Sequence, residues 1–252
     1  MPPLLGYLWW LSVATAWFAL IRLAIHRMYR FYPALFTYLA IVACSDCVLL
    51  LLDPTTMRYV WSWVAIESAL LLARILVVWE LVRLVCAGYR GIGNFARLLI
   101  VLAVGTAAIL CIVTAPLELQ AAPWTQRAYQ LLLMAGRWTT TVLSGVVLLF
   151  TAFFAVYGHP GKLNLDRHRW ITTIYLLGNS VLWFWAEMGD KIRAGGLRML
   201  LSVACVFAWG WLLVPQGEED KKPPSLGLDA VDRWNTELIA VGQRVLGSGR
   251  EG

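Results

Sequence analysis

Long apolar runs, separated by short polar connectors, make up most of this chain. A membrane-spanning helix needs about 20 mostly apolar residues. Seven segments meet this requirement, and turn-forming stretches such as "DPTT", "YRGIGN" and "GHPGKLNLD" lie between them. The pattern therefore predicts an all-α integral membrane protein in which residues 1–214 form a seven-transmembrane-helix bundle. The predicted spans are about Leu4–Ile25, Phe31–Leu52, Tyr59–Val85, Phe95–Ala115, Ala128–Tyr157, Trp170–Met188 and Leu197–Val214.

The pattern changes after the last predicted span. Residues 215–225 form a charged, Pro-rich linker, and residues 247–252 are predicted to be a disordered end. Between them, residues 226–246 have apolar positions three or four residues apart, with charged residues on the opposite face, which predicts an amphipathic helix. This helix could lie on the membrane surface, fold back under the bundle or bind a protein partner. Its apolar face consists of Leu228, Val231, Trp234, Leu238, Val241 and Val245.

Composition supports the membrane class. The chain is 60% hydrophobic and 14% charged, whereas soluble domains are about 45–50% apolar and about 25% charged. The net charge of +6 does not indicate nucleic-acid binding, because the basic residues are scattered through the short connectors. We therefore expect the lipid bilayer, and no nucleic acid, as a partner.

The distribution of basic residues predicts the orientation. Connectors on one side are rich in Lys and Arg, and the positive-inside rule places them in the cytoplasm. The N-terminus is then outside and the C-terminus is cytoplasmic. The chain has no N-x-S/T glycosylation acceptor and no Cys in the predicted outer loops, so we expect a bacterial inner (plasma) membrane. The basic connectors carry Arg22, Arg27 and Arg30, then Arg83, Arg90 and Arg97, then Lys162, Arg167 and Arg169.

Charged residues inside the predicted spans are the main candidates for a site, because such residues are costly in lipid and usually face the bundle interior. At about 1.5 Å rise per residue, Asp46, Glu67 and Arg137 share a depth of about 10–14 Å from the outer side. We expect them to form one ligand-binding or ion-pair cluster. A purely structural role in holding the helices together is an equally open alternative.

A second polar cluster is predicted in the inner half. Arg74 lies about 10 Å deeper than Glu67, which predicts that the two do not pair directly. Arg74 is instead expected to meet Asn179 and Tyr175. Glu80 is expected to form an interfacial pair with Arg83, exposed to water.

Several cofactors and activities are not expected. His26, His159 and His168 are predicted to lie in loops or at span ends, which disfavours haem and a buried His-rich metal site. The last predicted span has no Lys to bind retinal. The Cys44 and Cys47 pair lies in mid-span, where thiols act as small hydrophobic groups. No nucleophile–base pair is identifiable, so an enzyme is not predicted, although enzymatic activity is left open.

Two hypotheses for function follow. The first is a non-enzymatic receptor-like or sensor module, or a membrane subunit of a larger complex, which contacts a protein partner through the C-terminal helix or forms a homo-oligomer. The alternative is a small-solute or proton transporter or channel that uses Asp46, Glu67 and Arg137.

Overall fold

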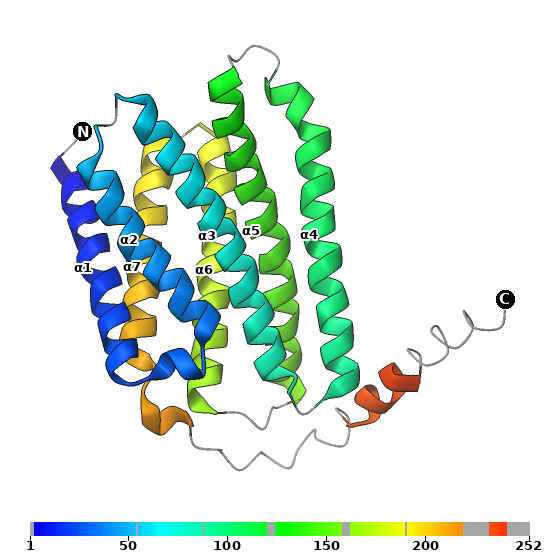
Figure 1. Ribbon diagram of the computed structural model, residues 1–252. Coiled ribbons are helices and arrows are strands. Elements are labelled where there is room, and N and C mark those ends of the chain that lie inside the picture. Colours follow the sequence, from blue (N-terminus) through cyan, green and yellow to red (C-terminus); the bar gives the residue numbers. More distant parts are fainter. Residues whose placement is uncertain are drawn as a thin grey trace.

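The computed structural model describes residues 3–53, 55–87, 89–119, 124–157, 162–189, 191–218 and 232–240. These residues form seven long helices that run up and down side by side in one bundle (Figure 1). The helices are α1 (Pro3–Ile25), α2 (Pro33–Leu51), α3 (Met57–Val85), α4 (Arg90–Leu119), α5 (Trp124–Tyr157), α6 (Leu163–Glu187) and α7 (Lys191–Leu212). Short 3-10 turns, η1 (Met28–Arg30) and η2 (Pro215–Glu218), follow α1 and α7.

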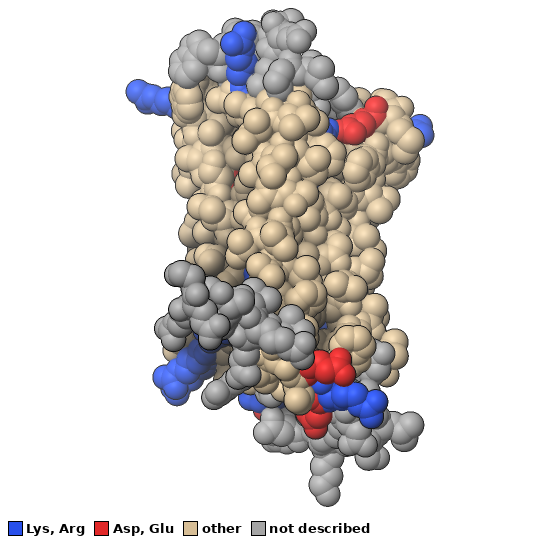
Figure 2. Space-filling model, turned by 90° about the vertical axis from the view of Figure 1, so that its right-hand side faces the viewer, with Lys and Arg blue, Asp and Glu red and all other residues tan. Residues whose placement is uncertain are grey.

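Five of the helices, α1, α2, α4, α5 and α7, contain segments long and apolar enough to cross a membrane. This suggests an integral membrane protein. On the face shown in Figure 2, charged side chains gather at the two ends of the molecule, and a broad, mostly uncharged band lies between them. Such a band is expected where lipid tails surround a bundle. The remaining helices, α3 and α6, contain no such segment among the described residues.

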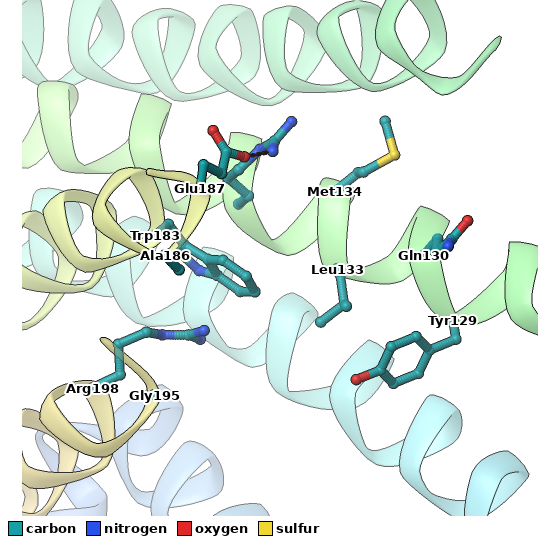
Figure 3. A pocket seen from close by; sticks show the side chains of 10 residues that line it. Tyr129, Gln130, Leu133, Met134, Trp183, Ala186, Glu187, Gly195 and Arg198 are labelled. Atoms are coloured by element: carbon teal, nitrogen blue, oxygen red, sulfur yellow. Dashed lines mark ion pairs between the residues drawn. The ribbon is translucent and has the colours of Figure 1, made fainter. Parts of the chain in front are cut away.

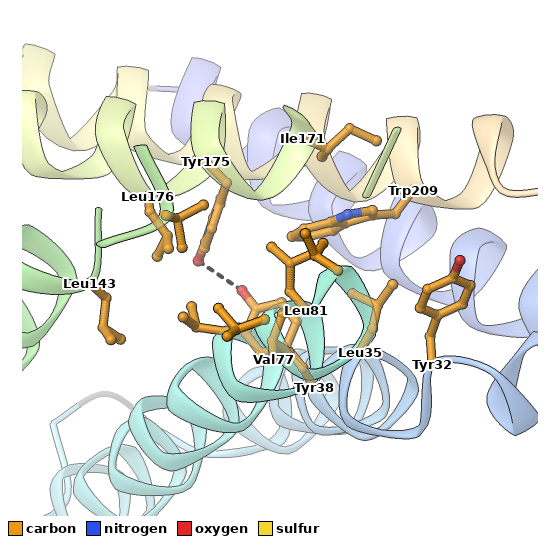
Figure 4. Close-up of a cluster of buried hydrophobic side chains, with 14 of the residues drawn as sticks. Tyr32, Leu35, Tyr38, Val77, Leu81, Leu143, Ile171, Tyr175, Leu176 and Trp209 are labelled. Carbon is orange, nitrogen blue, oxygen red and sulfur yellow. Dashed lines mark hydrogen bonds between the residues drawn. The ribbon is translucent and has the colours of Figure 1, made fainter. Parts of the chain in front are cut away.

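Helix α6 is polar because its interior face is enclosed by other helices. It packs against α5, α7 and α3, and its buried residues include more polar than apolar side chains. A hydrogen-bonded polar side chain is tolerated in such an interior, whereas it would be costly against lipid. Figure 4 shows the apolar part of the core, where Leu176 of α6 lies near Leu143 of α5 and Val77 of α3.

Glu80 caps another helix and does not form the predicted water-exposed pair with Arg83. The Glu80 residue is only 7% exposed, and its carboxylate accepts hydrogen bonds from the backbone N–H groups of Ala34 and Leu35 at 2.7 and 3.2 Å. These N–H groups belong to the first turn of α2, where backbone N–H groups have no acceptor within their own helix. The interfacial prediction was wrong because periodicity within one helix does not reveal a neighbouring helix end.

The C-terminal segment contacts the end of the bundle at which α4 begins. Residues 232–240 are helical, and the side-chain oxygen of Asn235 accepts a hydrogen bond of 2.7 Å from the backbone N–H of Gly91. Leu238 packs against the buried core. Trp234 is half-exposed. The other positions of the predicted apolar face, Leu228, Val231, Val241 and Val245, lie outside the described residues, as do the linker residues 219–225 and the end 247–252.

Candidate functional site

Two cavities lie toward the end of the bundle at which α1 begins, which we call the N-terminal end. Cavity A has a volume of about 750 Å³ and is lined by α5, α6 and α7 (Figure 3). Its polar lining comprises Tyr129, Gln130, Arg137, Glu187 and Arg198. Ligand-binding cavities commonly measure about 300–1,000 Å³, so cavity A is large enough for a small molecule.

Cavity B has a volume of about 390 Å³ and is lined by five helices, α1, α2, α3, α6 and α7. It reaches from Trp9, in the second turn of α1, and Tyr59, in the first turn of α3, to Arg74, near the middle of α3. Its charged lining residues are Asp46, Arg74 and Arg198. The convergence of charged side chains on one cavity is typical of a binding site.

Arg198 lines both cavities. Its guanidinium carbon lies 3.7 Å from the centroid of the Trp183 ring, and its Nε donates a hydrogen bond of 3.5 Å to the side-chain oxygen of Asn179. Stacking on an aromatic face holds the planar guanidinium in one orientation. The position of Arg198 therefore places a fixed positive charge between cavity A and cavity B.

Glu67 and Arg74 form a direct ion pair, contrary to the sequence-based prediction. The Glu67 Oε1 and Arg74 Nη1 atoms are 3.0 Å apart, and the two side chains are 22% and 15% exposed. The backbones of Glu67 and Arg74 lie about 10 Å apart in depth, but helical side chains lean toward the N-terminus of their helix. The long Arg74 side chain therefore extends back toward Glu67 and spans the two helical turns between them.

The other two members of the predicted outer cluster have different partners. Asp46 accepts a hydrogen bond of 3.1 Å from the Ser12 hydroxyl. Arg137 pairs with Glu187, which links α5 to α6 in cavity A (Figure 3). Asp46 lines cavity B and Arg137 lines cavity A, so the structure does not bring Asp46, Glu67 and Arg137 together. Equal depth is not sufficient for contact, because it says nothing about which helices are neighbours.

The predicted inner group, Arg74, Tyr175 and Asn179, lies around cavity B. The side-chain amide of Asn179 donates a hydrogen bond of 2.8 Å to the backbone oxygen of Tyr175, one turn earlier in α6. The hydroxyl groups of Tyr175 and Tyr38 are 2.7 Å apart (Figure 4). The contact between the two hydroxyl groups joins α2 to α6 at the inner part of cavity B. Asp46 of the predicted outer cluster and all three members of the predicted inner group thus line one cavity.

Arg198 and His168 are the main residues that the sequence analysis missed. Arg198 is the second residue of the predicted last span, but α7 begins at Lys191, so this residue is about two turns inside a helix. His168 was predicted to lie at a span end, yet it is fully buried in α6 and accepts a hydrogen bond of 3.1 Å from the indole N–H of Trp209. The signal for both was the polar sequence at or before the start of each predicted span, which is helical in the structure.

Within the described residues, no group of three or more His, Cys, Asp or Glu side chains is arranged to hold a metal ion. Comparisons with protein-family models, with curated proteins and with solved structures found no match to this chain. The candidate function therefore depends on the chemistry of the two cavities.

Proposed function

We propose that this chain is a non-enzymatic, receptor-like multi-pass membrane protein that binds a small polar ligand in cavity B. The observation that carries the proposal is the approach of Asp46, Arg74 and Arg198 to one cavity of about 390 Å³. Charged groups are costly inside a membrane protein and usually mark a functional path or site. Five helices line this cavity, so a ligand bound there would contact most of the bundle and could shift its packing.

In the same proposal, all seven long helices cross the membrane, with the N-terminus outside and the C-terminus in the cytoplasm of a bacterial cell. The distribution of basic residues supports this orientation. The ends of helices opposite the N-terminal end carry Arg22, Arg83, Arg97 and Arg167. Cavity A then lies toward the outer end of the bundle, whereas cavity B extends from that end past the middle of the bundle to Tyr38 and Val206. The C-terminal segment is available to a cytoplasmic partner.

Chemical labelling tests whether cavity B is reached from outside. The variant Ser202→Cys places a thiol in the cavity lining on α7, in a background from which the five native Cys are removed. A membrane-impermeant thiol reagent added to right-side-out vesicles is expected to label it. The matched control is Leu200→Cys on the same helix, which lies on the exposed apolar surface and should react slowly in lipid.

The possible outcomes separate the hypotheses. Labelling of Ser202→Cys from the outside alone supports a receptor-like site. Labelling from both sides favours the alternative of a small-solute transporter or channel. A thiol that reacts in unfolded protein but from neither side in vesicles would contradict a cavity that binds ligands from solution.

A further inference from the structure

Two negative and two positive side chains lie in or next to cavity B, and only one positive and one negative side chain form an ion pair. Arg74 is neutralised by Glu67, which lies on the same helix. Asp46 and Arg198 also line the cavity, from α2 and α7, and among the described residues neither has an oppositely charged group within 4.0 Å. One negative and one positive group are thus held on different walls of one cavity, without an ion pair between them.

The surroundings of Arg198 fit an acidic group of a ligand. Arg198, Asn179 and Ser202 line cavity B from α6 and α7, and Arg74 lines it from α3. The Nε atom of Arg74 is buried and has no hydrogen-bond partner. A carboxylate or phosphate is the group that guanidinium donors bind best, through charge-assisted hydrogen bonds.

The surroundings of Asp46 fit a positively charged group. Its carboxylate accepts a single side-chain hydrogen bond, from Ser12, although an ionised carboxylate can accept about four. Trp9, Tyr59 and Trp63 line the same cavity from α1 and α3. Aromatic rings next to a carboxylate favour an ammonium group, which is attracted to ring faces as well as to the negative charge.

We propose that the ligand of cavity B is a zwitterion that carries a primary ammonium and an acidic group, with its ammonium at Asp46 and its acid at Arg198. This inference depends on the proposed ligand-binding function and specifies its chemistry. A ligand with a single charge would leave one of the two protein charges without a counterion, whereas a ligand with both an ammonium and an acidic group satisfies both. Free amino acids and the phosphoethanolamine headgroup of a lipid share this chemistry.

The test measures the melting temperature, Tm, of the purified full chain in detergent, because a ligand that binds the folded state raises Tm. The probes are β-alanine and phosphoethanolamine, compared with ethanolamine alone, with inorganic phosphate alone and with an equimolar mixture of the two. We expect one or both zwitterions to raise Tm, and the mixture of the separate charges to have little effect. A further arm compares nanodiscs of phosphatidylethanolamine with nanodiscs of phosphatidylglycerol, which distinguishes a lipid headgroup from a free solute.

Two charge-neutralising variants test the orientation. Asp46→Asn and Arg198→Gln are each expected to weaken zwitterion binding by about tenfold to a hundredfold, because each loses one charge-assisted interaction. Asp46→Glu and Arg198→Lys keep the charges and should retain measurable binding, which separates a lost contact from a misfolded protein. Asp53→Asn and Arg58→Gln change the same residue types at exposed positions of the N-terminal end and should bind normally.

The outcomes also separate this inference from the proposed function. If phosphate or ethanolamine alone raises Tm as much as phosphoethanolamine, the zwitterion is the wrong class, although a binding site remains. If Ser202→Cys is unreactive from outside and no probe or lipid changes Tm, both the ligand class and the receptor-like function are wrong. If Asp46→Asn and Arg198→Gln each bind the zwitterion as tightly as the unchanged chain, the proposed contacts are also wrong.

Discussion

At the residue scale, the carboxylate of Glu67 compensates the positive charge of the largely buried Arg74 side chain. The two groups are 3.0 Å apart, and Arg74 also lies near Tyr38 and Tyr175 at the inner part of cavity B. Removing one partner of such a pair leaves the other charge without compensation in a poorly solvated place. Glu67 therefore stabilises the fold whether or not cavity B binds a ligand.

We expect Glu67→Ala to lower the free energy of unfolding by on the order of 2 kcal/mol. This is less than the roughly 3–5 kcal/mol lost when a fully buried pair is broken, because both side chains are partly exposed. Glu67→Gln keeps a hydrogen-bond acceptor and should lose less. The measurement is thermal unfolding of the purified protein in detergent.

The double variant Glu67→Met with Arg74→Met is the matched control for this pair. It removes both charges and keeps the apolar volume, so it should recover most of the stability lost in Glu67→Ala. If Glu67→Ala is as stable as the unchanged chain, the ion pair contributes nothing to the fold, and the structural role assigned to Glu67 is wrong.

At this scale, the sequence allowed part of the site to be predicted. Polar and charged residues inside apolar runs were recognisable, because such residues are unfavourable in lipid. Four of them, Asp46, Arg74, Tyr175 and Asn179, line one cavity. Their partners were not predictable. The direction and length of a side chain decide whether Glu67 reaches Arg74, and the neighbour relations of the helices decide whether Asp46 meets Arg137. A single sequence contains neither kind of information explicitly.

At the scale of elements, the C-terminal segment acts as a cap for α4. The first N–H groups of a helix have no partners within that helix. The side-chain oxygen of Asn235 accepts a hydrogen bond from one of them, the N–H of Gly91. Burial raises the pKa of Tyr89, which precedes α4, and the carboxylate of Asp232 raises it further. Ile239 also approaches Gly91, so the contact comprises polar and apolar parts.

Gly91→Ala is expected to displace residues 232–240 from the bundle. A Cβ atom at this position would lie 2.4 Å from the backbone oxygen of Asn235, which is too close for both to remain in place. Helix α4 itself should persist, because Ala favours helices more than Gly does. Limited trypsin digestion at the exposed Arg233 should therefore be several-fold faster in the variant, since cleavage requires a locally open segment.

Gly93→Ala provides a control two residues away on the same helix. Its Cβ atom would meet the Cβ of Cys86 at 3.4 Å, which is an ordinary contact, so digestion at Arg233 should not change. Equal digestion rates for the two Ala variants would show that Gly91 does not hold the C-terminal segment. Faster digestion in Gly91→Ala alone would make this contact a candidate switch for partner binding.

For the whole molecule, hydrophobic patterning predicted an all-helical membrane protein, but it does not identify every long helix equally well as a membrane span. Seven membrane spans were expected; the described residues form seven long helices, and five of these have the length and composition of membrane spans. The two helices that fall short, α3 and α6, carry Glu67, Arg74 and Asn179. A polar helix that is packed among other helices loses the apolar signature that identifies a span, so composition alone cannot decide whether it crosses the membrane.

Cysteine labelling decides whether α3 and α6 cross. If α3 spans the membrane, Thr55 and Ala87, which flank it and are both exposed, must face opposite sides. The same holds for Lys162 and Met188, which flank α6.

In a background without native Cys, we expect an impermeant thiol reagent to label Thr55→Cys and Met188→Cys in right-side-out vesicles. Ala87→Cys and Lys162→Cys should be labelled only after the vesicles are opened, because all seven helices then place the basic ends in the cytoplasm. Labelling of Thr55→Cys and Ala87→Cys from one side would instead exclude α3 as a span, and with it the membrane-embedded position of cavity B.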